Sequence, residues 1–286
     1  MKRTGAFNSW QTWKVSAAIR AGLLFIMVST SAAAADEGGL WTLWQRHSGE
    51  PENHEAALAA CENFIKNHPS DSFAAVAQTI AAWHFLKTGR MEEARAALTP
   101  WLKDSADPVL AGARELARAW LTCMDIEQVR ESLQQYYRRE VRYPEKIADI
   151  AAHRGIPASQ RPVMADRWGQ AWTYQPADFK IMSGFRGQRC LVASRKLGDY
   201  SRLVAALKVP YADLIRIEPV RALAGPDGTP MVVQFRRLPA AGAKANEVLV
   251  IQQGAFTEGF YLAHAGPGLI LVCDLLHWRA WKTPRR

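Results

Sequence analysis

The sequence predicts an α+β fold, with helices in its first half and short strands in its second half. Apolar residues between Pro51 and Leu121 recur at helical spacing, without the alternation typical of strands. Two runs bounded by Gly and Pro, at 171–175 and 188–194, have the composition of strands. After residue 209, short apolar or alternating runs recur evenly between turn signals, which indicates antiparallel sheet.

Length and charge exclude some classes of protein. With 286 residues, of which 49% are hydrophobic, the chain has material for one large or two to three small domains. Four residues of the first 35 contribute to the net charge of +9 without any acidic counterpart: Lys2, Arg3, Lys14 and Arg20. The remaining excess of basic over acidic residues is spread along the rest of the chain. Nucleic-acid binding needs a dense basic stripe with stacking aromatics, so we predict a solvated basic surface and no nucleic-acid partner.

The first 35 residues have the order of a secretory signal peptide. A basic leader precedes the apolar run 21–28, and small residues ending at Ala35 offer a cleavage site before Asp36. The apolar run is shorter than the roughly 20 residues of a transmembrane helix. An uncleaved anchor is the alternative. We therefore expect export to the periplasm or cell envelope of a bacterium.

Export to an oxidising compartment raises the question of disulfides. The four cysteines allow three pairings, between which the sequence does not choose. We expect Cys61 to pair with Cys123 in the helical half and Cys190 with Cys273 in the strand-rich half; four buried free thiols are an equal alternative. No Cys/His spacing suggests zinc, and we expect no cofactor or metal.

Helices are expected throughout residues 36–124, which we predict to form the first domain after the signal peptide. One helix ends at Asn67-His68-Pro69, and the next runs from Asp71 or Ser72 to Gly89, whose left-handed conformation suits a helix end. A third spans 91–102, and Asp107-Pro108 opens a fourth.

These helices resemble tetratricopeptide repeats. The resemblance implies a concave face for peptides or partner proteins; a generic helical hairpin bundle is the alternative. The four histidines of this half lack an i, i+4 pair, so we expect surface or helix-end positions rather than metal ligands. Residues at the repeat offsets are Ala57, Phe64, Pro69, Ala82, Phe85, Gly89, Ala94, Leu98 and Trp101, and the histidines are His47, His54, His68 and His84.

The segment 125–208 is predicted to form a second domain. Asp125 with Gln128 has the pattern of a capping box, so a helix is expected to start there and run to about Glu140. A loop, the turn Asp166-Arg167-Trp168-Gly169 and the two strands follow. A short helical turn is expected at 203–207.

This segment resembles the globular domain of the major pseudopilin of type II secretion systems, over residues 126–200. The resemblance implies a pilin-like helix plus a small antiparallel sheet. Structural roles are expected, since Asp166 can accept backbone amides, Trp168 can bury its ring and Gly169 permits positive φ. The matching residues are Tyr143, Pro144, Asp166, Trp168, Gly169, Trp172, Tyr174 and, with Gly198, Ser194.

Two departures from the pseudopilin pattern limit what it implies. A signal peptide and helices stand in place of the apolar helix that packs pseudopilins into filaments, so a fibre subunit is not expected. The segment 196–199 offers a single carboxylate, whereas calcium prefers several oxygen ligands, so the calcium site of the family is not expected here.

Residues 209–286 are predicted to form a small all-β barrel or sandwich. Their strand rhythm is similar to that of a module in the inner-membrane clamp protein of type II secretion. His264 and His277 are expected to be structural. The expected strands are 214–220, 231–236, 247–252, 259–265, 269–273 and 277–281, with turns at Pro226-Asp227-Gly228 and Gly266-Pro267-Gly268.

Together these features favour a non-enzymatic exported envelope protein, an accessory or regulatory factor of a type II secretion or pilus-like system that acts through protein partners. Membrane contact is expected only through partners or an uncleaved signal sequence. The alternative is a stand-alone periplasmic scaffold or peptide-binding protein that reuses the pseudopilin-like module. No hydrolase, P-loop or dinucleotide motif occurs, and the one candidate for an enzyme is a Ser–Lys pair of Ser194 and Lys196.

Overall fold

The computed structural model describes residues 36–153, 156, 161–182, 185–208, 217–223, 231–238 and 248–284. The predicted signal peptide, residues Gly155 and Pro157 of the predicted loop, and the predicted turn Pro226-Asp227-Gly228 lie outside these residues. In this part of the chain no helix has the length and hydropathy that a bilayer crossing requires.

The first half is helical, as predicted. Asp36 caps the first helix by accepting the Gly39 N–H, and Asn53 caps the second by accepting the Ala56 N–H. Gly89, after the third helix, has φ +77°, the left-handed conformation expected there. These helices are α1 (Glu37–Gly49), α2 (His54–Asn67), α3 (Phe73–Lys87), α4 (Met91–Leu98) and the 3₁₀ helix η1 (Thr99–Leu102).

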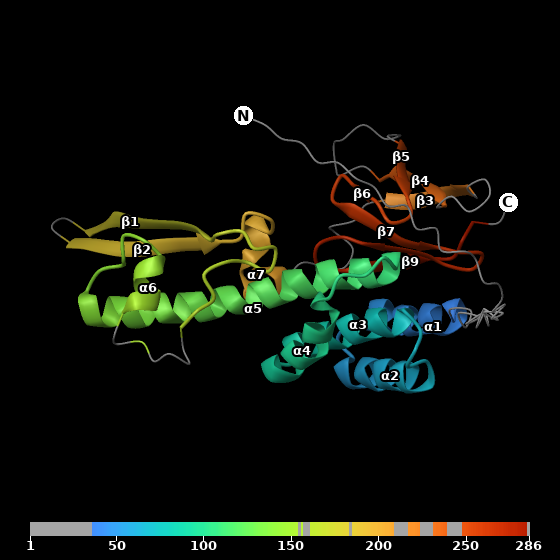
Figure 1. Cartoon of the computed structure of the whole chain (residues 1–286), viewed down its shortest axis with the longest axis horizontal. Coiled ribbons are helices and arrows are strands. Elements are labelled where there is room, and N and C mark those ends of the chain that lie inside the picture. The colour runs from blue at the N-terminus through green and yellow to red at the C-terminus, as the bar shows by residue number, and fades with distance from the viewer. Residues whose placement is uncertain are drawn as a thin grey trace, which may run out of the picture. The chain divides into compact units, whose positions relative to one another are not determined.

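The long helix α5 (Pro108–Glu140) is one continuous element (Figure 1). Its N-cap is Asp107, which accepts the N–H groups of Val109 and Leu110. The expected helix start at Asp125 is therefore wrong. Asp125 lies in the middle of α5 with 1% of its surface exposed, and the boundary predicted between residues 124 and 125 falls inside this helix.

The two predicted central strands form an antiparallel pair, β1 (Thr173–Met182) and β2 (Phe185–Ala193). Trp172 and Val192 bury their side chains against Ile126, Val129 and Leu133 of α5. The pair thus lies along the C-terminal half of that helix (Figure 1). Short elements complete this region: α6 (Ala148–Ala152), η3 (Gly198–Ser201) and the expected helical turn, α7 (Leu203–Lys208).

The last part of the chain forms two antiparallel sheets, of three and four strands, whose inner residues share one hydrophobic cluster. The strands match the predicted runs closely; residues 214–216 of the first run lie outside the described residues, and β6 was not expected. The α+β class is confirmed. The strands are β3 (Ile217–Leu223), β4 (Val232–Arg237), β5 (Val248–Gln252), β6 (Phe256–Thr257), β7 (Phe260–Ala265), β8 (Ile270–Cys273) and β9 (Trp278–Trp281).

Helices and the last sheet share a core. Trp278 of β9 donates its indole N–H to Thr79 Oγ1 of α3 at 2.8 Å, and Trp120 of α5 donates to the Leu276 carbonyl at 3.0 Å. A Cβ placed on Gly112 of α5 would lie 2.8 Å from Trp278 Cη2, so the helix approaches β9 closely there. Residues from Ala35 to Arg286 accordingly belong to one compact unit.

All four cysteines are free, so the expected pairs Cys61–Cys123 and Cys190–Cys273 do not form. The two members of each expected pair lie in different clusters: Cys61 lies among α1–α3 and Cys123 beside α4, while Cys190 packs toward α5 and Cys273 belongs to the cluster of Cys61. Cys273 of β8 is fully buried. Burial raises the pKa of the Cys61 thiol to about 12, which keeps it neutral.

Candidate partner-binding groove

Asp166 organises the turn that the pseudopilin resemblance singled out. Its Oδ1 accepts the backbone N–H groups of Trp168 (3.0 Å) and Gln170 (2.9 Å), as predicted. Its Oδ2 accepts the hydroxyl of Ser194 at 2.8 Å. Gly169 has φ +79°, also as predicted. One buried carboxylate therefore joins the turn to the end of β2.

Three hydrogen bonds fix this turn to α5. The Arg167 backbone N–H donates to Thr122 Oγ1 (3.1 Å), and the Arg167 side chain donates to Asp125 Oδ2 (2.6 Å). The indole N–H of Trp168 donates to Glu115 Oε2 (2.9 Å). Asp125 also pairs with Arg95 of α4 at 3.1 Å, which explains why a carboxylate is tolerated in the middle of a buried helix.

Ser194 is a structural hydroxyl. It is 1% exposed, donates to Asp166 and accepts the backbone N–H of Lys196 at 3.2 Å. The Lys196 ammonium lies 5.8 Å above the ring of Phe256. The hydrogen bond that the Ser194 hydroxyl donates thus goes to Asp166, and the Lys196 ammonium lies near Phe256.

Other motif residues hold the start of β1, which pairs with the end of β2, and the middle of β2. Tyr174 donates its hydroxyl to the Pro144 carbonyl (2.8 Å), and Trp172 donates its indole N–H to the Val163 carbonyl (2.7 Å). The Tyr143 backbone N–H donates to Gln188 Oε1 of β2 at 2.9 Å. These motif residues thus connect β1 and β2 to their flanking loops by hydrogen bonds.

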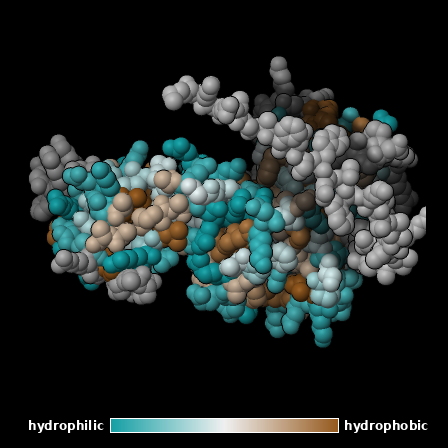
Figure 2. All heavy atoms as spheres, in the orientation of Figure 1, coloured by the Kyte–Doolittle hydropathy of each residue, from teal (hydrophilic) through white to brown (hydrophobic). Residues whose placement is uncertain are grey.

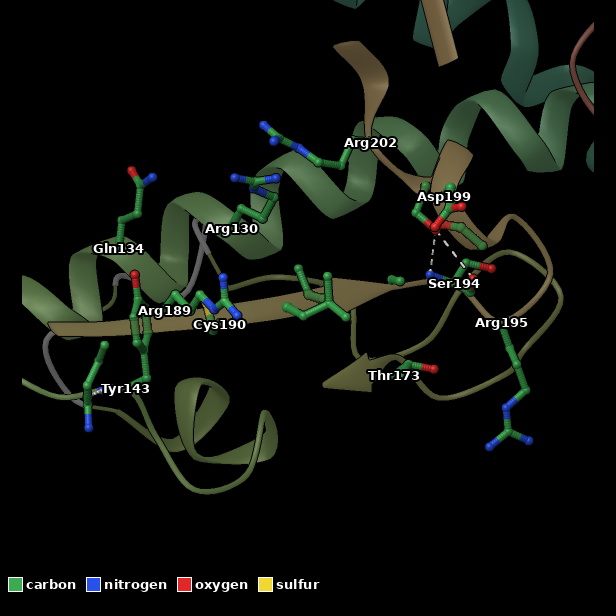
Figure 3. A pocket seen from close by; sticks show the side chains of 16 residues that line it. Arg130, Gln134, Tyr143, Thr173, Arg189, Cys190, Ser194, Arg195, Asp199 and Arg202 are labelled. Atoms are coloured by element: carbon green, nitrogen blue, oxygen red, sulfur yellow. Dashed lines mark hydrogen bonds between the residues drawn. The ribbon is translucent and has the colours of Figure 1, made fainter. Parts of the chain in front are cut away.

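A groove of about 550 Å³ lies beside these hydrogen bonds and is bounded by β2, α5 and the segment around η3 (Figure 3). Its lining contains four arginines and one acidic side chain, Asp199. In Figure 3, Arg130 of α5 and Arg202 lie on the same side of β2, whereas Arg195 points away from them. Glu127 lies 3.9 Å from both the Arg130 and Arg202 side chains. The fourth arginine of the lining is Arg189.

A second groove, of about 840 Å³, lies over α2, α3 and α4. Leu58, Ile65 and Phe85 give it an apolar floor, while Glu62 and Arg90 stand among its polar residues. On the face seen in Figure 2, hydrophilic residues predominate and apolar ones occur in small groups. Both grooves are lined by a mixture of polar and apolar side chains.

The four histidines of the helical half lie at helix ends, as predicted, but two of them are not at the surface. His47 and His84 are buried, and packing of α1 on α3 places His47 Nδ1 2.8 Å from His84 Nε2. His84 Nδ1 lies 2.9 Å from His54 Nδ1. Burial is the main cause that lowers the pKa of His47, and it lowers that of His84 to about 4.

This histidine chain does not form a metal centre. His84 turns one ring nitrogen to each neighbour, so the three rings do not converge on one point. Among the described residues, no group of three or more His, Cys, Asp or Glu side chains is placed to hold a metal ion. His264 is hydrogen-bonded to Glu37 at 2.7 Å, in agreement with the structural role predicted for it.

Comparison of the chain with protein-family models, with curated proteins and with solved structures gives no match. The resemblances described above therefore rest on the named residues and their arrangement. The groove along β2 could not be predicted from sequence, since Arg130 and Arg202 come together only through packing. No sequence spacing relates them.

Proposed function

We propose that the protein is a non-enzymatic exported envelope protein, which serves as an accessory or regulatory factor of a type II secretion or pilus-like system through protein–protein contacts. One observation carries the proposal. The polar groups of the pseudopilin-like motif, Asp166 and Ser194 above all, are engaged in hydrogen bonds that join the turn at Asp166 to the end of β2. What this region offers to other molecules is an open, arginine-lined groove.

The finer fold assignments belong to the same proposal. A helix followed by Tyr143-Pro144, an Asp-x-Trp-Gly turn and an antiparallel pair supports the pilin-like reading. Ala82 and Ala94 are buried where α3 meets α4, which supports tetratricopeptide-like packing. The shared cluster of the two C-terminal sheets supports a small barrel or sandwich.

Export by the predicted signal peptide would place these surfaces in the periplasm or cell envelope, where such machines assemble. Partners would be proteins, including secretion or pilus components. The basic residues are spread along the sequence rather than gathered in a dense cluster with aromatics, so nucleic acid is not proposed as a partner.

The alternative function is a stand-alone periplasmic scaffold or peptide-binding protein. The groove over α2–α4 favours it, because all residues that line this groove belong to the helical half and none to the pseudopilin-like segment. Apolar side chains at its floor with charged groups around them suit a partner peptide or helix. The two functions thus differ in which groove receives the partner.

Site-specific photo-crosslinking in a bacterial envelope tests both. A photoreactive residue replaces Leu191, which borders the β2 groove and is 57% exposed, or Leu58 in the helical groove; Val248 on β5, 60% exposed, is the control. Crosslinks from position 191 to a pilin or secretion component are expected. Crosslinks from position 58 alone, to proteins unrelated to secretion, would favour the alternative. No crosslink above the control at either position would contradict both.

A further inference from the structure

The edge of β2 that faces away from β1 borders the groove. β1 and β2 form a sheet of two strands, so in the part of the chain that the structure describes no third strand covers that edge. The groove is bordered by every residue from 188 to 195. Successive side chains of a strand point to opposite faces, so a groove touched by all of them must follow the edge itself. A strand edge offers backbone N–H and C=O groups to an extended peptide.

Charge around this edge selects the partner. Arg130 and Arg202 keep 30% and 50% of their side-chain surfaces exposed, so they are partly desolvated but open to a ligand. Glu127 lies 3.9 Å from each of them, at the outer limit of an ion pair. Guanidinium groups bind carboxylates in a bidentate manner, which favours an acidic guest over a neutral or basic one.

The two faces of β2 differ, and a guest strand would have to match them. Cys190 and Val192 point toward α5, the helix that carries Arg130, whereas Leu191 points away and is exposed. A guest strand paired with β2 would continue the same alternation. Its α5-side residues would meet Arg130 and Arg202, and its outer residues would lie beside Leu191 and the exposed Arg189. Acidic residues are therefore expected at every second position, with apolar residues between them.

We propose that β2 binds an extended protein segment of alternating acidic and apolar residues as an added strand, with Arg130 and Arg202 pairing its carboxylates. The inference rests on the proposed function, because it names the chemistry of the partner at the same groove. Main-chain hydrogen bonds to β2 supply affinity that is independent of sequence, and the arginines supply the preference for acidic residues.

The test uses the full chain and a fluorescent peptide of alternating glutamate and valine, about eight residues long to match a strand. Fluorescence anisotropy is expected to show binding that weakens with salt. Arg130→Glu and Arg202→Glu are each expected to weaken it by about tenfold or more, since they replace attraction by repulsion. Arg138→Glu is the matched control: it is exposed on the same helix and does not line the groove. A peptide of alternating lysine and valine should not bind.

Strand addition has a signature that charge attraction lacks. Only one edge of the guest strand faces β2, so N-methylation of alternate amides on that edge should abolish binding, while methylation of the other alternate set should leave it within about twofold. Equal affinity for both methylated peptides would overturn the inference. So would tighter binding to vesicles of anionic lipid than to the peptide, with the same loss in Arg130→Glu and Arg202→Glu.

The outcomes separate this inference from the proposed function. Crosslinking of a secretion component at position 191 without peptide binding would refute strand addition and leave the function standing. Peptide binding with the expected methylation pattern, but without such a crosslink, would leave the inference standing and refute the function. Circular dichroism of each variant checks that it is folded; Arg130 and Arg202 are partly exposed, so both variants are expected to fold.

Discussion

The side chain of Asp166 accepts three hydrogen bonds within the pseudopilin-like segment. Replacing it with Ala removes the acceptor for two backbone N–H groups and for Ser194. We expect Asp166→Ala to lower the free energy of unfolding by about 2 kcal/mol, because buried donors would lose their partner. Asp166→Asn, which keeps an acceptor oxygen, should cost about 1 kcal/mol or less. Urea unfolding measures both.

The exposed Asp199 serves as the control for this comparison, and its replacement by Ala should change stability little. Equal losses for Asp166→Ala and Asp166→Asn would mean that the negative charge, rather than the acceptor geometry, holds the turn.

Two buried histidines predict a dependence of stability on pH. His84 has its pKa lowered from 6.5 to about 4, and His47 is lowered too, chiefly by burial. Below pH 6.5 the unfolded chain therefore takes up protons that the folded chain does not accept. This contribution to the free energy of unfolding is fully present above pH 6.5 and is lost progressively as the pH falls toward 4.

Urea unfolding at a series of pH values, with and without His84→Gln, isolates this effect. The variant removes one titrating group and should show a shallower loss of stability with acid. Asp274 acts in the opposite sense, since burial raises its pKa to about 6 and makes the folded chain the better proton acceptor there. The difference between the free energies of unfolding of the parent and the variant at each pH does not contain the contribution of Asp274, because both chains share it. Identical pH profiles would refute the role of His84.

At the scale of elements, the contact of α5 with β9 depends on Gly112. Gly112→Ala would place a methyl group 2.8 Å from Trp278 Cη2, and Trp278 is held by its hydrogen bond to Thr79. Overpacking of about 1–3 kcal/mol should exceed the gain of about 1 kcal/mol in helix propensity. Thermal unfolding should show net destabilisation and altered tryptophan fluorescence. Gly49→Ala, which meets nothing within 4 Å, is the control and should not destabilise.

Elements governed by local sequence were predictable from the chain. The strands at 231–236 and 247–252 became β4 and β5 with ends shifted by a single residue, because alternation is a local signal. The start of α5 at Asp107-Pro108 was predicted correctly. The second helix start predicted at Asp125 was wrong, and the partners of Asp125, Arg95 and Arg167, come from distant parts of the chain. A polar residue paired by tertiary contacts looks like a helix cap when only its neighbours in sequence are known.

The same distinction applies to the site. Asp166, Gly169 and their turn could be predicted because the residues concerned are adjacent. The groove could not, since Arg130, Arg202 and β2 meet only in the folded chain. Likewise the spacing of His47, His54 and His84 gave no hint that α1, α2 and α3 bring their rings together.

At the scale of the whole molecule, the helices and the last sheet depend on each other. Residues of α1, α3 and α5 share a core with Tyr261, Leu271 and Trp278. We expect residues 36–286 to unfold in one cooperative transition, with helix content and tryptophan fluorescence changing together. A chain that ends at Lys208 would expose that core and should lose cooperativity. A native-like transition in the shortened chain would show instead that the segment before residue 209 is an autonomous domain.

Because α5 is one continuous helix, the direction in which one end faces its partner fixes the direction in which the other end faces. Near Gly112 and Trp120 the helix faces β7–β9, and near Ile126 and Leu133 it faces the β1–β2 pair. Each residue advances a helix by about 100°. One residue inserted between these stretches would therefore turn one face away from its partner. Seven inserted residues would restore the phase to within about 20°. Neutral variation in the length of this helix is thus expected to come in heptads.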